Sequence, residues 1–357
     1  AYYSNGKLTY TSLSYYFQFC KKLFVIGREK HIGEPLDAKF VSSGSNIYIH
    51  GLPSPISKNG IKNRKWLQSR YQEIISKVDF LVVRLPSEHG LACIDVAKKM
   101  GKRVIVEMVA SPFDCLWYRG DLAAKLYAPI LSFRVKKALE KSQNSIYVTK
   151  RYLQSNYPTK GNSIGVSDVE IEHIAAPKTL GMKKKYRVGV IGNPELKLKG
   201  IKDLFYAVKA SSIDIELSIV GGSLRSELEV HMSKYDFVEQ RGFISDKASM
   251  NQWISSLDLY VQPSYTEGLP RSVIEAMAQG VPVMGSCVGG IPELVNDNAL
   301  FKPGDSLEIT NIIERIISDV NLYNELAKHS IYRARSFNKE EKEKKVQFIR
   351  KATVNPY

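Results

Sequence analysis

The chain of 357 residues has few cysteines and no long apolar run. Its four cysteines are scattered and form no Cys-x-x-Cys pair, which argues against a disulfide framework or a zinc site and favours a reducing compartment. No apolar run reaches the ~18 residues that suggest a membrane-spanning helix, and no signal peptide pattern opens the chain. We therefore expect a cytoplasmic protein, with peripheral contact at the inner face of the plasma membrane left open.

Acidic residues are also scarce relative to basic ones. The 36 Asp and Glu residues face 51 Lys and Arg residues, which gives a net charge of +15. Such a surplus attracts phosphorylated substrates, nucleic acid or an anionic membrane, but it does not choose among them. No helix-turn-helix, zinc or RNA-binding signature is present, so nucleic acid is not the expected partner.

The pattern that is present is an alternation of apolar strand-like runs and helix-like stretches. The strand-like runs are continuous rather than alternating, which is typical of parallel strands covered on both faces. Repeated β-α units of this length predict an α/β fold with two Rossmann-like, doubly wound parallel sheets facing a cleft. The strands are expected at 22–28, 46–52, 79–86, 103–109 and 145–150, and then at 186–192, 215–222, 237–244, 258–264 and 281–286.

The join between the halves is expected in a stretch with Pro177, Gly181 and three consecutive lysines. The predicted domains are an acceptor-binding domain over residues 1–177 and a nucleotide-sugar-binding domain over 178–337. A last helix within 338–357 is expected to pack back on the first domain.

The most informative segment runs from Pro263 to Glu293, PSYTEGLPRSVIEAMAQGVPVMGSCVGGIPE. A strand ends there, a loop with Gly268 follows, and Pro270 sits in the first turn of a helix, where proline is well tolerated. Free N–H groups at such a helix start, together with the helix dipole, form a site suited to a diphosphate. Glu267 and Glu275 would place two carboxylates beside it, able to accept hydrogen bonds from sugar or ribose hydroxyls.

This segment resembles the signature of glycosyltransferase family 4, the group 1 glycosyltransferases of the GT-B fold. The family pattern, PS..EG.P....EAMA.G.PV......GG..E, is complete here from Pro263 to Glu293. The resemblance extends over about residues 186–304, and similar first domains occur in bacterial surface-polysaccharide enzymes.

The resemblance implies a role for each matching residue. Glu275 would bind the ribose, Glu267 the transferred sugar, and the backbone of Gly268, Leu269 and Pro270 the diphosphate. Lys199 matches a lysine that neutralises the leaving diphosphate. The arginine of that loop is replaced by Asn193, a departure that puts the two-cation clamp in doubt, and Lys197 is a candidate second cation.

Weaker motifs extend this predicted donor site. Gly222 belongs to a glycine-rich turn similar to one in the family, and Phe243 and Ile244 lie at the strand end where the base is usually recognised by backbone in that family. In the first half, topology alone proposes Gly6, Arg84, His89 and Asp114 as acceptor-side residues. The basic stretch Arg119–Ser142 fits either a membrane-facing helix or an ordinary packed one.

The resemblance implies a retaining, metal-independent glycosyltransferase. It would move a sugar from a nucleotide diphosphate sugar, with a UDP-sugar as the leading donor and no cofactor, to a hydroxyl acceptor. A lipid-linked saccharide is the leading acceptor and bacterial polysaccharide assembly the leading process. A catalytically inactive GT-B partner module and a basic nucleic-acid-binding protein are the alternatives.

Overall fold

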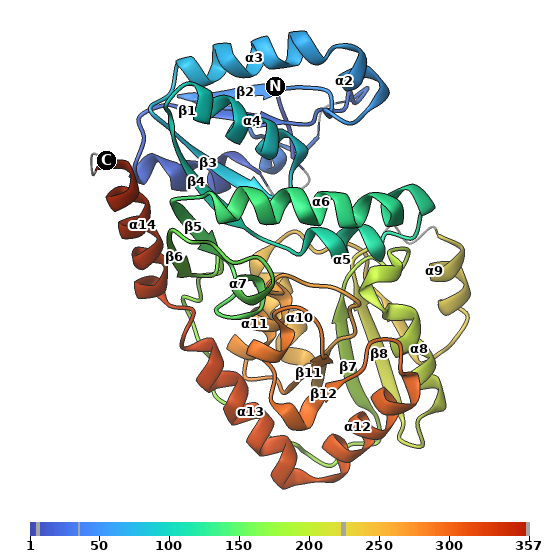
Figure 1. Cartoon of the computed structure of the whole chain (residues 1–357). Coiled ribbons are helices and arrows are strands. Elements are labelled where there is room, and N and C mark those ends of the chain that lie inside the picture. The colour runs from blue at the N-terminus through green and yellow to red at the C-terminus, as the bar shows by residue number, and fades with distance from the viewer. Residues whose placement is uncertain (5–7, 35, 223–225, 355–357) are drawn as a thin grey trace.

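A computed structural model describes residues 1–4, 8–34, 36–222 and 226–354. The chain folds into two α/β halves, one above the other in Figure 1. No helix within the described ranges is both long and apolar enough to cross a membrane.

The second half is built on one parallel sheet of six strands in the order β12-β11-β10-β7-β8-β9. Numbered along this half alone, the order is 3-2-1-4-5-6 read from the other edge, which is the Rossmann arrangement. The order reverses between β7 and β10, where Gly189 of β7 pairs with Tyr260 of β10 on one side and Ser218 of β8 on the other. The strands are β7 (Tyr186–Ile191), β8 (Ile215–Val220), β9 (Val238–Gln240), β10 (Leu259–Gln262), β11 (Val283–Ser286) and β12 (Leu300–Phe301).

Helices cover both faces of this sheet because their apolar residues recur on one side. In α8, for example, Ile201, Leu204 and Phe205 are all buried. The helices are α8 (Ile201–Ala210), α9 (Glu227–Met232), α10 (Lys247–Ser256), α11 (Arg271–Ala278), α12 (Ser306–Ser318) and α13 (Val320–Ala334).

The first half differs from the single sheet that the sequence predicts. Strands β1 (Leu23–Gly27) and β2 (Ile47–Gly51) form a parallel pair, and β3 (Phe80–Leu85), β4 (Arg103–Met108), β5 (Asn144–Tyr147) and β6 (Asn162–Gly165) form a separate parallel sheet. All of β1 is only partly buried, so it lacks the two-sided cover that the apolar run suggested. The helices are α1 (Tyr10–Ser14), α2 (Lys58–Lys62), α3 (Arg64–Ser76), α4 (Glu88–Lys99), α5 (Pro112–Trp117), α6 (Leu122–Glu140) and α7 (Tyr152–Asn156).

Most predicted elements appear within a few residues of their expected bounds. The stretch 237–244 is the main exception, because the strand ends at Gln240 and Gly242 has a φ of 63°. A left-handed residue cannot continue a strand, and its carbonyl instead accepts from the N–H of Gly221 at 2.6 Å.

The last helix, α14 (Lys339–Val354), leaves α13 and runs alongside the first half (Figure 1). Ile349 is fully buried with Ile105 of β4 and Ile146 of β5. Lys345 is buried too, and its ammonium contacts the carboxylates of Glu107 and Asp168. This helix therefore joins the two halves a second time, after the loop between β6 and β7.

Candidate active site

The loops after β7 and β10 lie together at the point where the strand order reverses. The Tyr265 N–H donates to the Leu198 carbonyl at 2.8 Å. A Cβ on Gly200 would lie 1.9 Å from the Pro263 carbonyl oxygen, and its φ is 64°, so glycine is required there for two reasons. Ligands of open parallel sheets bind at such a switch point, outside the carboxyl ends of the strands.

Lys199 and Glu267 meet across these two loops. The Lys199 Nζ lies 2.7 Å from Glu267 Oε1, and both side chains are largely buried. The same oxygen accepts from Ser264 Oγ at 2.9 Å and from Gln262 Nε2 at 3.2 Å. Within the described residues no protein donor reaches Glu267 Oε2, which leaves this oxygen for a ligand.

Beneath this pair lies a buried hydrogen-bond network that the motif analysis missed. Gln262 Oε1 accepts from Tyr260 OH at 2.8 Å and from Ser272 Oγ at 2.9 Å. Gln262 Nε2 donates to Ser264 Oγ at 2.8 Å. The network fixes the orientation of the Glu267 carboxylate, and its signal in the sequence is Gln262, a polar residue that ends an apolar strand.

The helices that follow these two strands begin without side-chain caps. The residue that precedes α8 is Gly200 and the one that precedes α11 is Pro270, and neither has a side chain that accepts from the first turn. By contrast, the side chains of the residues that precede α9, α10, α12 and α13 do accept; these are Ser226, Asp246, Asp305 and Asp319. The first N–H groups of α8 and α11 thus remain open to an anion at the switch point.

Glu275 lies one turn into α11 and is mostly buried. Burial raises the pKa of its carboxyl, while the charge of Arg271 acts in the opposite direction. The Arg271 guanidinium stands 3.9 Å away and is itself largely exposed. Since this partner is weak, the carboxylate is available to accept hydrogen bonds from a ligand.

The other predicted donor-side residues occupy varied positions. Asn193 Oδ1 accepts from the Glu195 N–H at 3.0 Å, so this side chain shapes its own loop. Lys197 is exposed at the start of a short 3₁₀ turn. Gly222, with a φ of 85°, lies where a Cβ would meet a Glu229 carboxylate oxygen. Phe243 is exposed, whereas Ile244 packs against the core.

Segments of the first half pack against the loop after β10 (residues 263–270), which we call the donor loop. A Cβ on Gly268 would lie 2.1 Å from the Val109 carbonyl oxygen, and the rings of Tyr118 and Tyr265 are 5.5 Å apart. Burial raises the pKa of the Cys115 thiol to about 11, with the charges of Asp114 and Glu267 acting in the same direction. The loop after β4 and α5 therefore form the opposite wall of the site.

The predicted acceptor-side residues do not form one cluster. Arg84 pairs with Glu107 at 3.2 Å and with Asp168 at 2.8 Å. His89 is buried, and its Nδ1 lies 2.7 Å from Tyr71 OH. Burial and the charge of Arg28 lower the pKa of its imidazole, which favours a neutral ring.

Asp114 accepts from Tyr152 OH at 2.7 Å and stands beside Cys115 on the wall of the site. Among the predicted acceptor-side residues that the structure describes, Asp114 is the one that these contacts place beside the donor loop. Gly6 lies outside the described residues.

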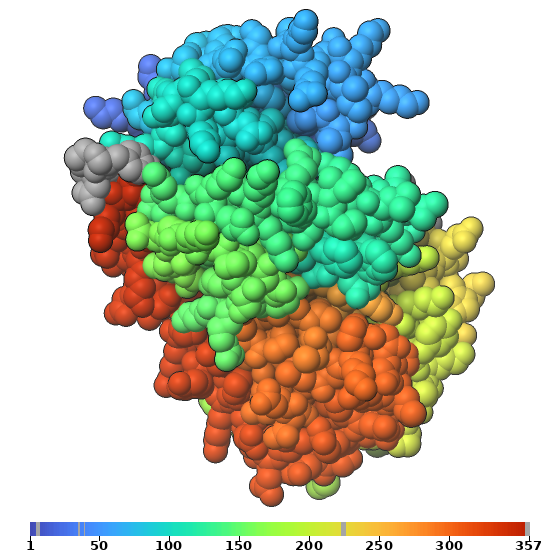
Figure 2. Space-filling view, viewed as in Figure 1, coloured from blue at the N-terminus to red at the C-terminus, as the bar shows by residue number. Residues whose placement is uncertain are grey.

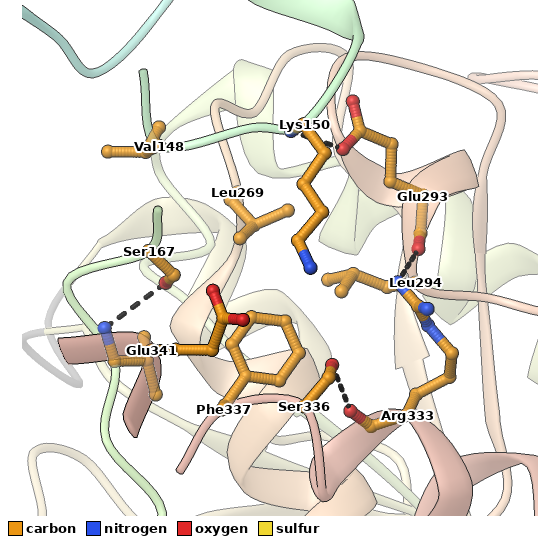
Figure 3. Close-up of a pocket in the computed structure, with 11 residues that line it drawn as sticks. Val148, Lys150, Ser167, Leu269, Glu293, Leu294, Arg333, Ser336, Phe337 and Glu341 are labelled. Atoms are coloured by element: carbon orange, nitrogen blue, oxygen red, sulfur yellow. Dashed lines mark hydrogen bonds between the residues drawn. The ribbon is translucent and has the colours of Figure 1, made fainter. Parts of the chain in front are cut away.

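A second contact between the halves centres on Glu293, which ends the signature segment. Its carboxylate accepts from the N–H groups of Lys150, Arg151 and Tyr152 at 2.7, 3.0 and 2.7 Å, and so caps α7 of the other half. The Arg333 guanidinium holds the Glu293 carbonyl. Figure 3 shows Lys150, Glu293 and Arg333 around a cavity of about 20 Å³, which has room for a water but not for a nucleotide.

Among the described residues no group of His, Cys, Asp and Glu side chains is arranged to hold a metal ion.

Comparison with known proteins matches this site to a family. Residues 185–319 match the model of glycosyl transferases group 1. Protein CapJ of Staphylococcus aureus is 32% identical over 328 residues, which span 88% of this chain and 82% of CapJ. The chain belongs to the group 1 glycosyltransferases. The lipopolysaccharide core biosynthesis mannosyltransferase LpsB of Rhizobium meliloti is 36% identical over 73 residues, 20% of this chain and 21% of LpsB.

Solved structures agree on the fold of this group 1 glycosyltransferase. Sucrose-phosphate synthase from Thermosynechococcus elongatus superposes with a TM-score of 0.70 at 19% identity, covering 92% of this chain and 88% of that enzyme. Anabaena HepE in complex with UDP gives 0.60 at 16% identity, covering 85% and 86%. At these identities the likeness establishes the GT-B fold, as the sequence predicted.

Proposed function

We propose that this glycosyltransferase moves a sugar from a UDP-sugar to a hydroxyl of a lipid-linked saccharide, with retention of anomeric configuration and without a metal ion. Bacterial polysaccharide assembly at the cytoplasmic face of the membrane is the process that we infer. The observation that carries the proposal is the Lys199–Glu267 pair, held between two uncapped helices where the strand order reverses. The names of LpsB and of HepE bound to UDP add support for the process and the nucleotide.

The donor would lie with its diphosphate over the starts of α8 and α11. Lys199 and the open N–H groups there would stabilise the charge that develops on the leaving diphosphate, which is the role that a metal ion plays in other transferases. Glu275 would accept from the ribose hydroxyls. Glu267 would use its free Oε2 to hold a hydroxyl of the transferred sugar, while Oε1 stays in the protein network.

In the transfer step the bond between the anomeric carbon and the diphosphate oxygen breaks. The acceptor hydroxyl forms the new bond on the same face of the sugar, and its proton goes to the departing diphosphate. Asp114, on the opposite wall, is the candidate for orienting the acceptor.

Thermal unfolding in the presence of UDP, GDP, ADP or CMP, each with magnesium or with EDTA, tests the donor assignment. At 100 times its dissociation constant a ligand adds about 2.7 kcal/mol to the free energy of unfolding. Of the four nucleotides, only UDP should raise the unfolding midpoint, and it should do so equally with magnesium and with EDTA. Stabilisation by GDP or ADP instead would assign a different base to the donor, and a requirement for magnesium would overturn the metal-free site.

The stereochemistry needs a separate measurement. With an α-linked UDP-sugar, proton NMR of the first product formed should show an α linkage. A β-linked product would contradict retention while leaving the donor assignment intact.

A further inference from the structure

Helix α6 carries two apolar faces on opposite sides. One face is buried against the first half and consists of Ala124, Ala128, Leu131, Val135 and Leu139. The other face is exposed although its residues are large and apolar. Leu122, Leu126, Ile130 and Phe133 are 73%, 67%, 53% and 65% exposed. Their spacing of four, four and three residues aligns them in one stripe.

The stripe continues onto the adjacent helix α5. Trp117 is exposed, and the Phe113 ring stacks on it at 5.3 Å. Lys125 of α6 lies over the Trp117 ring at 5.6 Å, so the two helices present one continuous surface. We call this surface the α5–α6 face and define it by its apolar residues Phe113, Trp117, Leu122, Leu126, Ile130 and Phe133.

The charges around the α5–α6 face are mainly basic, although exposed Glu140 lies at the end of α6, seven residues after Phe133. Lys125, Lys136, Lys137 and Lys141 are exposed along its border. Within the described part of the chain none of these four forms an ion pair, whereas Arg119 nearby is paired with Asp121 at 2.6 Å. An apolar stripe bordered by unpaired lysines complements a surface that is apolar within and negatively charged at its boundary, which is the chemistry of an anionic lipid bilayer.

The face is also accessible and adjacent to the site. Figure 2 shows the stretch around α6 as the green band across the front of the molecule, with nothing lying over it. At the end of α5, Tyr118 contacts Tyr265 of the donor loop. A surface on which this face rested would therefore lie close to the wall where Asp114 stands.

We propose that the α5–α6 face docks the enzyme on an anionic bilayer, with α6 in the plane of the headgroups. Leu126 and Phe133 enter the boundary of the acyl chains, and the four lysines contact lipid phosphates. Docking places the acceptor side of the cleft beside the membrane. The docking proposal rests on the proposed function only in its purpose, which is to bring the enzyme to a lipid-linked saccharide. The docking itself requires no turnover.

Co-sedimentation with two kinds of vesicle tests this docking. One is pure phosphatidylcholine and the other contains about 30% phosphatidylglycerol, both at 0.1 M salt. The full chain should bind the anionic vesicles at least tenfold more tightly, because each lysine near an anionic surface contributes about 1 kcal/mol, or fivefold. Equal binding to both kinds, or to neither, would overturn the proposal.

Matched variants locate the contact. Leu126→Gln with Phe133→Gln should weaken binding at least tenfold, and Lys136→Gln with Lys137→Gln about as much. The controls carry equal changes elsewhere. Leu307→Gln with Tyr332→Gln alters two side chains that are each 71% exposed on α12 and α13, and Lys328→Gln with Lys351→Gln removes two exposed lysines. Losses in the control pairs equal to those in the test pairs would overturn the assignment to this face.

Two further readouts separate this proposal from other outcomes. Light scattering of the free protein should give a monomer mass; a dimer that Leu126→Gln with Phe133→Gln dissociates would mean that the face binds a second copy instead. UDP affinity should be unchanged in all variants. Vesicle binding without UDP binding would sustain the docking and contradict the proposed function.

Discussion

Two charged clusters, one in each half of the molecule, differ in how completely their groups are paired. In the first half, Arg84 is held by Glu107 and Asp168, and Lys345 of α14 joins the same cluster. In the second half, Lys199 and Glu267 pair with each other at the cleft, and one oxygen of Glu267 stays open. Charges that satisfy one another away from the cleft stabilise the fold, whereas charges left partly open at a switch point are arranged to receive a ligand.

The largest expected effect concerns the buried cluster. Lys345→Ala removes one partner and leaves Glu107 buried, which should cost about 3–5 kcal/mol of unfolding free energy. The proximity of Glu107 and Asp168 outweighs burial and raises the pKa of Lys345, so the wild-type residue is charged at neutral pH. Chemical unfolding measures the loss. The control is Lys344→Ala, since Lys344 is exposed on the same helix; similar losses in both variants would contradict a special role for the cluster.

Lys199→Ala should act on turnover rather than on stability. Removing one group that stabilises a leaving charge lowers kcat by about 10²–10³-fold, or ~2.7–4 kcal/mol. Glu267 keeps its hydrogen bonds from Ser264 and Gln262 in this variant, so the unfolding midpoint should change less than in Lys345→Ala. Steady-state kinetics with a UDP-sugar and acceptor, next to a melting curve, gives both values. A variant with wild-type kcat would remove Lys199 from the chemistry.

Glu275→Ala should weaken UDP binding by about 1.5–3 kcal/mol, the value of hydrogen bonds to a charged group. Binding should also depend on pH. Because burial raises the pKa of Glu275, its carboxylate becomes protonated, and poorer as an acceptor, at a higher pH than an ordinary glutamate. Wild-type UDP affinity should therefore fall as the pH drops through that raised pKa, and Glu275→Gln should lose this dependence. Unchanged affinity in Glu275→Ala would refute the ribose contact.

The smallest expected effect concerns Lys197. It tests whether Lys197 supplies the second cation, since Asn193 stands where the family has an arginine. Lys197 is exposed, so its removal should reduce UDP affinity by only about 0.5–1 kcal/mol. The reduction should shrink at high salt, because exposed charges are screened. A Lys197→Ala enzyme with unchanged donor affinity and turnover would leave Lys199 as the single cation of this loop.

The sequence predicted the second half more closely than the first. Its central strands include fully buried apolar runs such as β10 and β11. Its signature places Glu267 and Glu275 at defined steps along the chain, and a separate loop of the same family places Lys199. The partners that hold Glu267 were not predicted, because the motif does not show that the side chains of Gln262 and Ser264, at the end of β10, turn toward the Glu267 carboxylate. In the first half, Arg84 and His89 were proposed because they lie where a strand was expected to end. Strand position alone does not reveal that Glu107 and Tyr71, distant in sequence, already bind these side chains.

Some contacts between the halves could not be predicted from the sequence either. Glu293 was visible as the last letter of the signature, but its three bonds to the start of α7 depend on how the halves meet. The exposure of one face of α6 depends on tertiary packing too, since its sequence fits both a membrane-facing helix and a packed helix.

The central claim is that the second half alone holds the nucleotide, over the starts of α8 and α11. Calorimetric titration of UDP in EDTA into the wild type, Lys199→Ala and Arg84→Gln tests it most directly. We expect metal-free binding by the wild type, at least tenfold weaker binding by Lys199→Ala, and affinity within twofold of wild type for folded Arg84→Gln. Loss of affinity in Arg84→Gln with none in Lys199→Ala would place the nucleotide elsewhere and contradict the account.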